Sequence, residues 1–485
     1  MSELKDKTVK GVAWSAVERF SAQGIQFVFN ILIARILLPE DYGVVAMLNI
    51  FLAVSQTFID SGFANALIRK QDRTEQDFCT VFWFNVGISV LFCLLLWIAA
   101  PAIASFYKTP LLTKITRILS LTLVIGAFGA IQGTQLSIRL DFKSRAIISI
   151  ITITMMGIVG YWMARHGYGV WALVVQNIAG NITRTVLLWV FVKWRPRLVF
   201  SKKSFKDMFG FGSKLLVSNL IDALYNNIYT IVIAKVYEPK TLGVYNRAES
   251  FASFPSSNFY GIINSVSYPA LCSIQNETER LRVSFSKFIR LSAYIVFPMM
   301  VGLAIVADPF IRVILTDKWQ ESIPLLQILC IALMLYPLDA LNIRFPIISG
   351  RSDLYMKVLI INKIIDIVVL IATIPIGIMA LCWGRVAAYV VCFFINTYYT
   401  GKLVGYGAFA QLKDIFKTII SATVMGVVVV LVTRHIGNDL LKLCVGVVAG
   451  ALFYWLTSVV FKIEEYSWLL EIVKKKGNGT TAESA

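Results

Sequence analysis

The stretch ILIARILLPEDYGVV at residues 31–45 returns as IVIAKVYEPKTLGVY at residues 231–245, an offset of 200 without a gap. Six positions are identical between the two copies, among them the Pro and the Gly of PEDYG and PKTLG. A Pro followed closely by a Gly is typical of a tight connection between two regular segments. Long apolar runs flank both copies, so the sequence predicts a chain with two related halves.

The overall composition identifies the class of protein. The chain has 485 residues, of which 57% are hydrophobic and 15% are charged, and its mean hydropathy is +0.72. An ordinary globular chain has roughly a quarter of its residues charged, and a membrane-spanning helix needs ~20 mostly apolar residues. The chain therefore has room for about 14 spans joined by short connections. We predict an all-α integral membrane protein with no folded soluble domain between its spans.

The apolar runs give the expected order of spans. They cover residues 12–34, 43–64, 80–105, 115–137, 146–165, 170–192, 212–236, 243–271, 288–315, 322–349, 356–377, 379–401, 415–435 and 440–461. The two repeat copies lie six spans apart and thus cross the membrane in the same direction. This is a parallel repeat, in which the substrate site lies between the halves. We expect an N-lobe with a linker at 1–200, a C-lobe at 201–405, and two further helices with a tail at 406–485.

The formal net charge of +18 raises the question of a nucleic-acid partner. The basic residues, however, gather in short connections between apolar runs, mostly on the side of the N-terminus. Basic connections face the cytoplasm and its anionic leaflet. We therefore predict membrane lipids rather than nucleic acid as the partner, an even number of spans, and both termini in the cytoplasm. The polar opening MSELKDKTVK shows no signal peptide.

Metal, cofactor and catalytic sites are not indicated. The seven cysteines are scattered without ligand spacing, and the two histidines, His166 and His435, lie far apart in the sequence. Cysteines of this kind usually serve in packing. The sequence contains no Gly-rich nucleotide-binding loop with its Lys and no Ser/His/Asp arrangement. We expect no metal, no cofactor, no catalytic residue and no enzymatic activity.

Polar side chains recur on single helical faces of the spans that adjoin the repeat. Those in the first and seventh spans are Gln23, Gln26 and Asn30, in register with Arg19, and Asn219 and Asn226. Polar side chains in lipid are costly, so they are expected to face water or one another. We predict a polar cleft between the two halves. The alternative is hydrogen bonding between the helices of a static bundle.

Charged residues inside the spans are the best candidates for substrate binding. The cations are Arg19, Lys214, Arg247, Arg184 and Arg385, and the acids are Glu18, Asp60, Asp222 and Glu249. Arginine forks bind pyrophosphate in a bidentate manner. The acids serve either as counter-ions or as sites that load H⁺ or Na⁺.

Three further charged residues lie in the spans of the second half. Lys363 and Asp366 are spaced as a structural salt bridge on a helix. Asp339, between Pro337 and Asn342, indicates a broken helix and is either a hinge or a ligand.

Several runs carry a resemblance to a known family. They are LLPEDYGVVAMLNIFLAVSQTFIDSGFANALIRKQDRTEQDFCTVFWFN (37–85), GYGVWALVVQNI (167–178), FGFGSKLLVSNLIDALYNNIY (209–229) and DKWQESIPLLQIL (317–329). Together they resemble Wzx-type polysaccharide and O-antigen flippases of the multidrug/oligosaccharidyl-lipid/polysaccharide (MOP) exporter superfamily. The likeness extends over nearly the whole chain.

This resemblance implies a flippase in the bacterial inner membrane. Its substrate would be an undecaprenyl-pyrophosphate-linked oligosaccharide, moved to the periplasmic leaflet for surface polysaccharide assembly. It also implies two six-helix lobes in a V shape, alternating access, coupling to an ion gradient, and a polysaccharide polymerase and chain-length regulator as partners. Arg19 and Arg247 occupy places where related flippases carry cavity arginines.

Three other functions remain open at this point. A drug exporter of the same superfamily is expected to have a smaller, more acidic and aromatic cavity. A membrane polymerase needs a sizeable outer loop with catalytic groups, and the outer connections here are too short. A non-transporting scaffold of the assembly complex predicts that the cavity charges can be replaced without loss of function.

Overall fold

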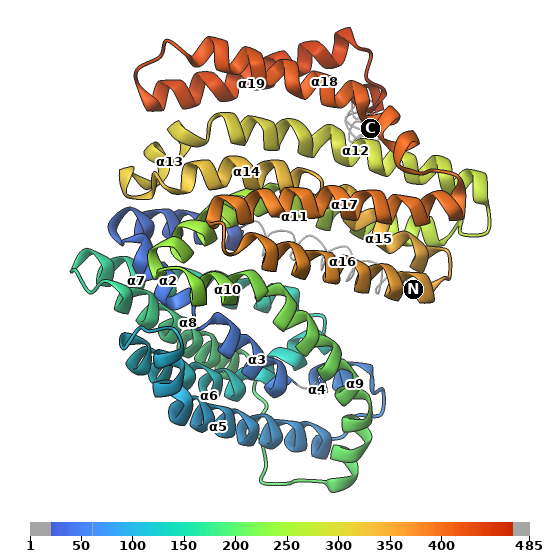
Figure 1. Ribbon diagram of the computed structural model, residues 1–485. Helices are drawn as coiled ribbons and strands as arrows, with labels where there is room; N and C mark the ends of the chain where they lie inside the picture. The colour runs from blue at the N-terminus through green and yellow to red at the C-terminus, as the bar shows by residue number, and fades with distance from the viewer. Residues whose placement is uncertain (1–20, 61, 469–485) are drawn as a thin grey trace, which may run out of the picture. The chain divides into compact units, whose positions relative to one another are not determined.

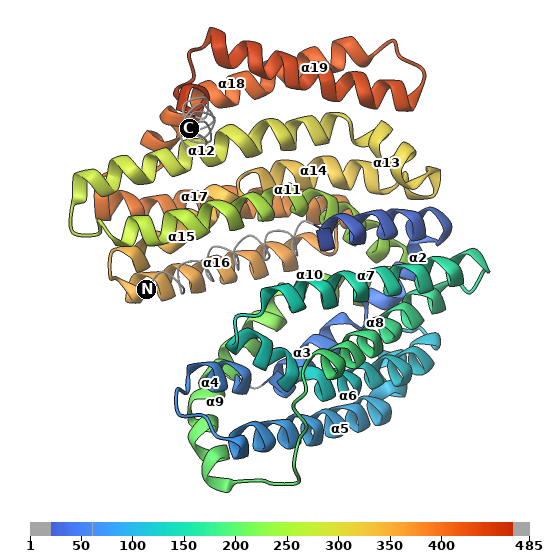
Figure 2. The ribbon, with the colours of Figure 1, turned by 180° about the vertical axis from the view of Figure 1, so that it is seen from behind.

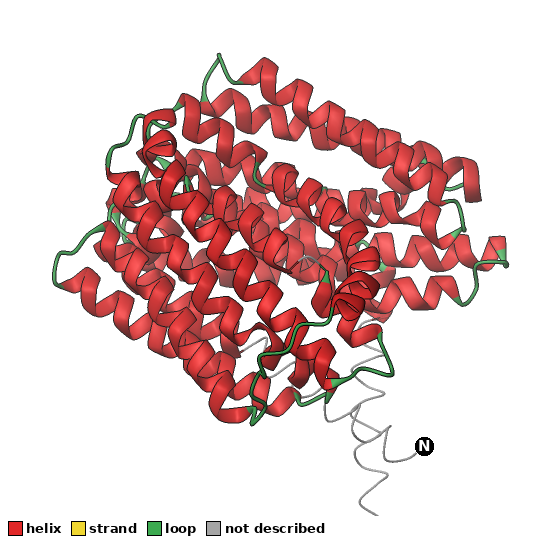
Figure 3. Ribbon diagram, turned by 90° about the horizontal axis from the view of Figure 1, so that it is seen from below, coloured by secondary structure: helices red, strands yellow, loops and turns green. Residues whose placement is uncertain are grey.

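The computed structural model describes residues 21–60 and 62–468, and every long element in those ranges is a helix (Figures 1 and 3). The chain divides into two compact units, Met1–Gly243 and Val244–Ala485. The prediction of an all-α membrane protein is confirmed.

The first unit contains a helix at 21–36 followed by nine labelled helices. These are α2 (Pro39–Ala46), α3 (Asn49–Asp60), α4 (Phe63–Arg69), α5 (Glu75–Phe106), α6 (Leu111–Ile138), α7 (Phe142–Arg165), α8 (Val170–Phe191), α9 (Lys202–Asn226) and α10 (Ile228–Val236). Helix α6 packs between α5 and α8, and α8 packs on α7 (Figure 2). Helix α9 packs on α3, α4 and α5, so this unit extends past the expected repeat boundary at residue 200. The three expected domains stay a prediction.

The second unit takes most of α11 (Pro239–Cys272) and all the helices that follow. These are α12 (Thr278–Ile305), α13 (Ala307–Leu315), the short 3₁₀ turn η1 (Asp317–Trp319), α14 (Ser322–Met334), α15 (Tyr336–Ile348), α16 (Ser352–Thr373), α17 (Ile378–Val404), α18 (Ala408–Thr433) and α19 (Asp439–Val460). The pair α18 and α19 packs on α12 (Figure 1). The Tyr294 hydroxyl donates to Ser458 Oγ at 3.1 Å, and the Tyr454 hydroxyl donates to the Tyr294 carbonyl at 2.7 Å. These bonds join α12 to α19.

The membrane helices follow the predicted spans closely. Within the described ranges, nine helical stretches are long and apolar enough to cross a membrane, including α5, α6, α7, α17, α18 and α19. The predicted spans outside this set include α8, which carries Arg184, and α16, which carries Lys363 and Asp366. Their polar side chains reduce the apolar character of each helix. The protein is therefore a multi-pass membrane protein, and the count of 14 spans stays a prediction.

The segments 39–43 and 239–243, predicted as tight turns, instead form the first turns of helices α2 and α11, and they meet each other inside the first unit. A Cβ added to Gly43 would overlap the carbonyl oxygen of Pro239, and a Cβ added to Gly243 would overlap that of Pro39. The two copies thus contact each other through equivalent residues. This explains why both copies carry a Gly four residues after the Pro, because any side chain there would force the backbones apart.

The predicted break near Asp339 is confirmed. Helix α14 ends at Met334 and α15 begins at Tyr336, with Pro337 in its first turn. Proline is suited to the first turn of a helix, where its missing N–H is not needed. Asp339 therefore lies in the first turn of the second half of a discontinuous span.

Candidate functional site

The predicted site residues are distributed over both units. Glu18 and Arg19 lie outside the described residues, and Lys214 belongs to α9, with a side chain that is likewise outside the description. The first unit holds Gln23, Gln26, Asn30, Asp60, Arg184, Asn219, Asp222 and Asn226. The second unit holds Arg247, Glu249 and Arg385.

In the first unit, Asp60 lies within electrostatic range of Arg184. Asp60 is the last residue of α3, and its Oδ1 accepts a hydrogen bond of 3.0 Å from Gln56 Nε2. Arg184, in the middle of α8, is near enough to act electrostatically on this carboxylate. Both side chains are exposed. An exposed charge in a membrane helix needs water or a polar ligand, since lipid cannot solvate it.

A polar face of α9 belongs to the same unit. Asn219, Asp222 and Asn226 follow one another at helical spacing, and all three side chains are exposed. The helix stops at Asn226, and α10 starts at Ile228. Discontinuous helices of this kind form substrate sites in transporters. The predicted helical face of the seventh span therefore ends at a break in the helix.

In the second unit, Arg385 is paired. Its Nη1 donates to Glu249 Oε1 at 2.6 Å and to the Tyr245 hydroxyl at 2.5 Å, which joins α17 to α11. The side chains of Arg385 and Glu249 are only 11% and 32% exposed. Glu249 is thus an ion-pair partner of Arg385, and the two roles expected for it, counter-ion or ion loading, stay predictions. Tyr245 was not predicted, although it lies at the end of the second repeat copy.

Arg247 lies over an aromatic ring that the sequence analysis did not place in the site. Its guanidinium carbon is 5.1 Å from the centroid of Trp319 and 6.0 Å from that of Phe251. Trp319 is fully buried and belongs to the DKW sequence of residues 317–329. A cation over an aromatic face is attracted by the negative charge of the ring, which helps to hold Arg247 in place. The DKW sequence was the signal that could have identified Trp319 as the residue beneath Arg247.

A buried polar network in the second unit was also missed. Asn362 Nδ2 donates to Asn396 Oδ1 at 3.0 Å, and Asn396 Nδ2 donates in turn to Asp339 Oδ1. These residues come from α16, α17 and α15. Asn362 Oδ1 is buried and has no hydrogen-bond partner among the described residues. Asp339 thus accepts from one carboxamide, that of Asn396, and is linked through it to Asn362. Whether Asp339 acts as a hinge or as a ligand stays a prediction.

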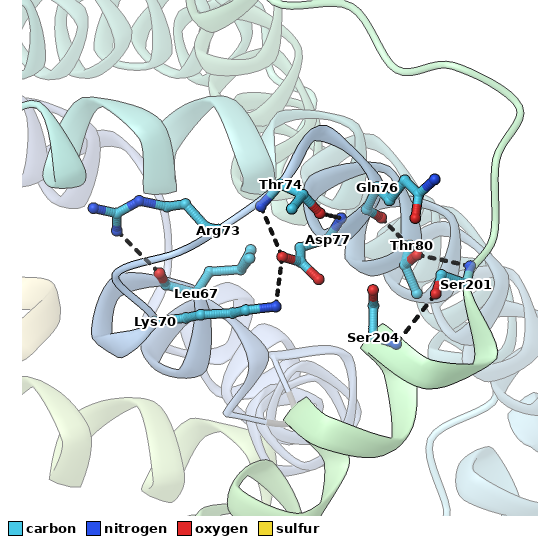
Figure 4. Close-up of polar contacts among 9 residues, drawn as sticks. All are labelled: Leu67, Lys70, Arg73, Thr74, Gln76, Asp77, Thr80, Ser201 and Ser204. Carbon is cyan, nitrogen blue, oxygen red and sulfur yellow. Dashed lines mark hydrogen bonds and ion pairs between the residues drawn. The ribbon is translucent and has the colours of Figure 1, made fainter.

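The polar residues of the 37–85 run mainly shape a turn. Asp77 Oδ2 accepts from Lys70 Nζ at 2.7 Å and from the Thr74 backbone N–H at 2.8 Å, while the Asp77 N–H donates to Thr74 Oγ1 at 3.4 Å (Figure 4). This is a capping box at the start of α5. The Asp77 carboxylate raises the pKa of the Lys70 ammonium by accepting its hydrogen bond. Residues 70–77 of this run therefore form a structural turn.

The same turn holds the linker that precedes α9. The Ser201 N–H donates to Thr80 Oγ1 at 3.0 Å, and the Ser204 N–H donates to Ser201 Oγ at 3.2 Å (Figure 4). Ser201 thereby caps α9 and ties it to α5. The segment that precedes α9 is thus fixed to α5 by the residue that caps α9.

Solved structures of similar fold come from one superfamily. The lipid II flippase MurJ in an inward closed conformation matches with a TM-score of 0.73 and 18% identity, covering 93% of this chain and 98% of that one. An inward-facing multidrug resistance MATE family transporter of the MOP superfamily matches with a TM-score of 0.61 and 15% identity, covering 81% and 99%. At these identities the matches establish the fold alone.

Relatives in sequence have names from polysaccharide biosynthesis. The teichuronic acid biosynthesis protein TuaB of Bacillus subtilis is 27% identical, over 94% of this chain and 95% of its own. The lipopolysaccharide biosynthesis protein WzxC of Escherichia coli is 29% identical, over 68% of this chain and 67% of its own. The succinoglycan biosynthesis transport protein ExoT of Rhizobium meliloti is 25% identical, over 96% and 95%.

A family model described as "Polysaccharide biosynthesis protein" matches residues 32–324, more than half of the chain. This range contains the repeat turns, Arg184, Arg247 and Trp319. The resemblance seen in the sequence is therefore confirmed, and the chain belongs to the polysaccharide biosynthesis protein family of membrane proteins.

Proposed function

We propose that the protein is a flippase for a lipid-linked oligosaccharide. It moves an undecaprenyl-pyrophosphate-linked repeat unit from the cytoplasmic to the periplasmic leaflet of the inner membrane, for assembly of O-antigen, capsule or exopolysaccharide. The observation that carries this proposal is the presence of arginines on long helices of a membrane protein: Arg184, exposed on α8, and Arg247, stacked on Trp319. The names of WzxC and ExoT and the fold shared with a lipid II flippase support it.

The pyrophosphate is the part of the substrate that these residues recognise. A guanidinium presents a fork of N–H donors that matches two phosphate oxygens. In our proposal Arg19, Lys214, Arg184, Arg247 and Arg385 provide the positive charge, and Gln23, Gln26, Asn30, Asn219 and Asn226 contact the sugars. The prenyl chain stays in lipid while the two halves rock to expose the site on the other side. This is transport rather than covalent chemistry, so no catalytic residue is assigned.

Ion coupling is part of the same proposal. Intramembrane carboxylates commonly load H⁺ or Na⁺ in transporters. Asp60 and Asp222 are exposed in the first unit, and Glu249 is held by Arg385 in the second. We assign Glu18, Asp60 and Asp222 to coupling and Glu249 to charge compensation. The basic connections favour cytoplasmic termini. A polysaccharide polymerase and a chain-length regulator are the expected partners.

Leaflet-resolved labelling of the glycolipid tests the proposal. Cells that lack the protein are complemented, at matched expression, with the wild type, with Arg247→Ala, or with Arg280→Ala as a control for an exposed arginine in the first turn of α12. We expect wild type and Arg280→Ala to restore periplasmic exposure. Arg247→Ala should reduce it on the order of tenfold or more, because charge-assisted hydrogen bonds contribute at least that much.

Two results would contradict the proposal. Normal periplasmic exposure in cells without the protein would remove the need for a flippase and favour a drug exporter or a scaffold. Full activity of Arg247→Ala would show that the site charges are dispensable, as the scaffold function predicts.

A further inference from the structure

A groove on the first unit lies apart from the residues assigned to the substrate. It runs between α6 and α8 and has a volume of about 500 Å³. Its walls are almost entirely apolar and include Ile125, Phe128, Ile182, Val186 and Val190. Sites for small molecules typically occupy about 300–1,000 Å³. The groove is thus large enough for part of a lipid chain.

The floor of the groove is held by bonds between its two helices. Thr185 Oγ1 donates to the Ile125 carbonyl at 2.9 Å, and Trp189 Nε1 donates to the Phe128 carbonyl at 2.8 Å. The helices approach closely at Gly129, where an added Cβ would lie 3.1 Å from Leu188 Cδ1. These contacts fix the spacing of α6 and α8. The groove is therefore preformed rather than opened by a ligand.

A cation lies at the end of the groove where α8 finishes. Arg195 lines the groove, and its guanidinium carbon is 4.9 Å from the Trp189 ring centroid. Nη1 donates to the carbonyls of Val192 and Trp194 at 2.9 Å each, and Nη2 donates to that of Trp189 at 3.0 Å. A guanidinium has five N–H groups. The Nε–H and one Nη2–H thus have no recorded acceptor in the described part of the chain.

The segment around Arg195 has the character of a membrane surface. Residues 193–206 contain six basic residues, Lys193, Arg195, Arg197, Lys202, Lys203 and Lys206, and no acid. Between the arginines and the lysines, Leu198 is 88% exposed and Phe200 is 52% exposed. Glu75, the acid that contacts this segment, accepts from Trp194 Nε1 at 2.6 Å. Basic residues beside exposed apolar ones are typical of contact with an anionic leaflet.

We propose that this groove binds one acyl chain of an anionic phospholipid, with the phosphate on Arg195. The apolar walls take the chain, the two available N–H groups of Arg195 take phosphate oxygens, and the neighbouring basic residues favour an anionic headgroup. Such a lipid would fasten the linker between the two repeats to the leaflet. Neither Arg184 nor Arg247 lines the groove, so its occupancy can be measured without transport.

Photolabelling of the purified full-length protein tests the site. The probe is phosphatidylglycerol with a photoactivatable group on one acyl chain, compared with the same analogue of phosphatidylcholine. Labelled peptides are then identified by mass spectrometry. Val186→Trp fills the groove at a residue that is 55% exposed, and Val447→Trp on α19, which is 58% exposed, is the matched control. Arg195→Gln and Arg195→Lys test the headgroup contact.

The expected result is phosphatidylglycerol label on α6 and α8. Val186→Trp and Arg195→Gln should each reduce it about tenfold, as expected for loss of a charge-assisted contact or of the chain site. Val447→Trp and Arg195→Lys should keep most of it. Equal labelling by phosphatidylcholine, or unchanged labelling of Val186→Trp, would overturn the proposal. Displacement of the probe by undecaprenyl pyrophosphate would also overturn it, because the groove would then belong to the substrate.

Discussion

The two copies of the repeat begin alike and continue differently. After the first Pro–Gly turn, α2 ends at Ala46, α3 runs to Asp60 and α4 starts at Phe63, so the span is interrupted twice. After the second turn, α11 continues to Cys272 in spite of Pro255 and Pro269. Proline is therefore not what interrupts the span, since membrane helices tolerate it. The break after α3 lies at Gly62, whose φ of 71° is left-handed.

This difference separates two kinds of charged residue. In the first half, the exposed Asp60 is the last residue of α3, beside a helix break, and lies within electrostatic range of Arg184. In the second copy, Glu249 occupies a continuous helix and is held by Arg385. Broken membrane helices supply binding groups, whereas paired charges on continuous helices maintain packing. The comparison thus separates an exposed carboxylate beside a helix break from a carboxylate paired on a continuous helix.

The largest loss of stability is expected where the two repeat copies contact each other, at Gly43 and Gly243. Gly43→Ala and Gly243→Ala each place a Cβ against a proline carbonyl of the other copy. We expect each to lower the free energy of unfolding by about 2–3 kcal/mol, as overpacking does. Thermal unfolding of the purified variants measures it. Gly24→Ala, where nothing lies within 4 Å, is the control. A large effect in only one copy would contradict the symmetry of the contact.

A smaller loss of stability is expected when the ion pair between Arg385 and Glu249 is broken. Arg385→Met leaves Glu249 without its cation and should cost about 2 kcal/mol, less than a fully buried pair because Glu249 is partly exposed. The double variant Arg385→Met with Glu249→Gln should regain most of this loss, since no unpaired charge remains. Thermal unfolding of the single and double variants tests this. If the double variant is as unstable as Arg385→Met, Arg385 contributes by packing rather than by charge.

A third stability effect is expected at the helix break between α3 and α4, at Gly62. Gly62→Ala puts a side chain at a left-handed φ and 3.0 Å from Gly212 Cα, so it should cost about 1–2 kcal/mol. Gly210→Ala, in the interior of α9 with nothing within 4 Å, should instead stabilise the protein by up to about 1 kcal/mol. We expect Gly62→Ala to lower the unfolding temperature and Gly210→Ala to raise it. Equal signs would mean that the break at Gly62 is not required.

The sequence predicted the spans well because apolar length and the repeat depend on local composition. It also predicted the break beside Asp339, since Pro337 belongs to the first turn of a new helix. It did not predict that Trp319 supports Arg247 or that Asn396 binds Asp339. Such contacts join helices far apart in the chain, and no periodic pattern records which side chains meet. The pairing of Arg385 with Glu249 was missed for the same reason.

Translocation by the purified protein tests the central claim most directly. Proteoliposomes receive undecaprenyl-pyrophosphate-linked oligosaccharide, and its movement between leaflets is followed for the wild type, for Arg184→Gln on α8, and for Arg165→Gln, an exposed control at the end of α7. The account predicts that the wild type and Arg165→Gln translocate the lipid and that Arg184→Gln is slower on the order of tenfold or more. Translocation by folded Arg184→Gln at the wild-type rate, or none by the wild type, would contradict it.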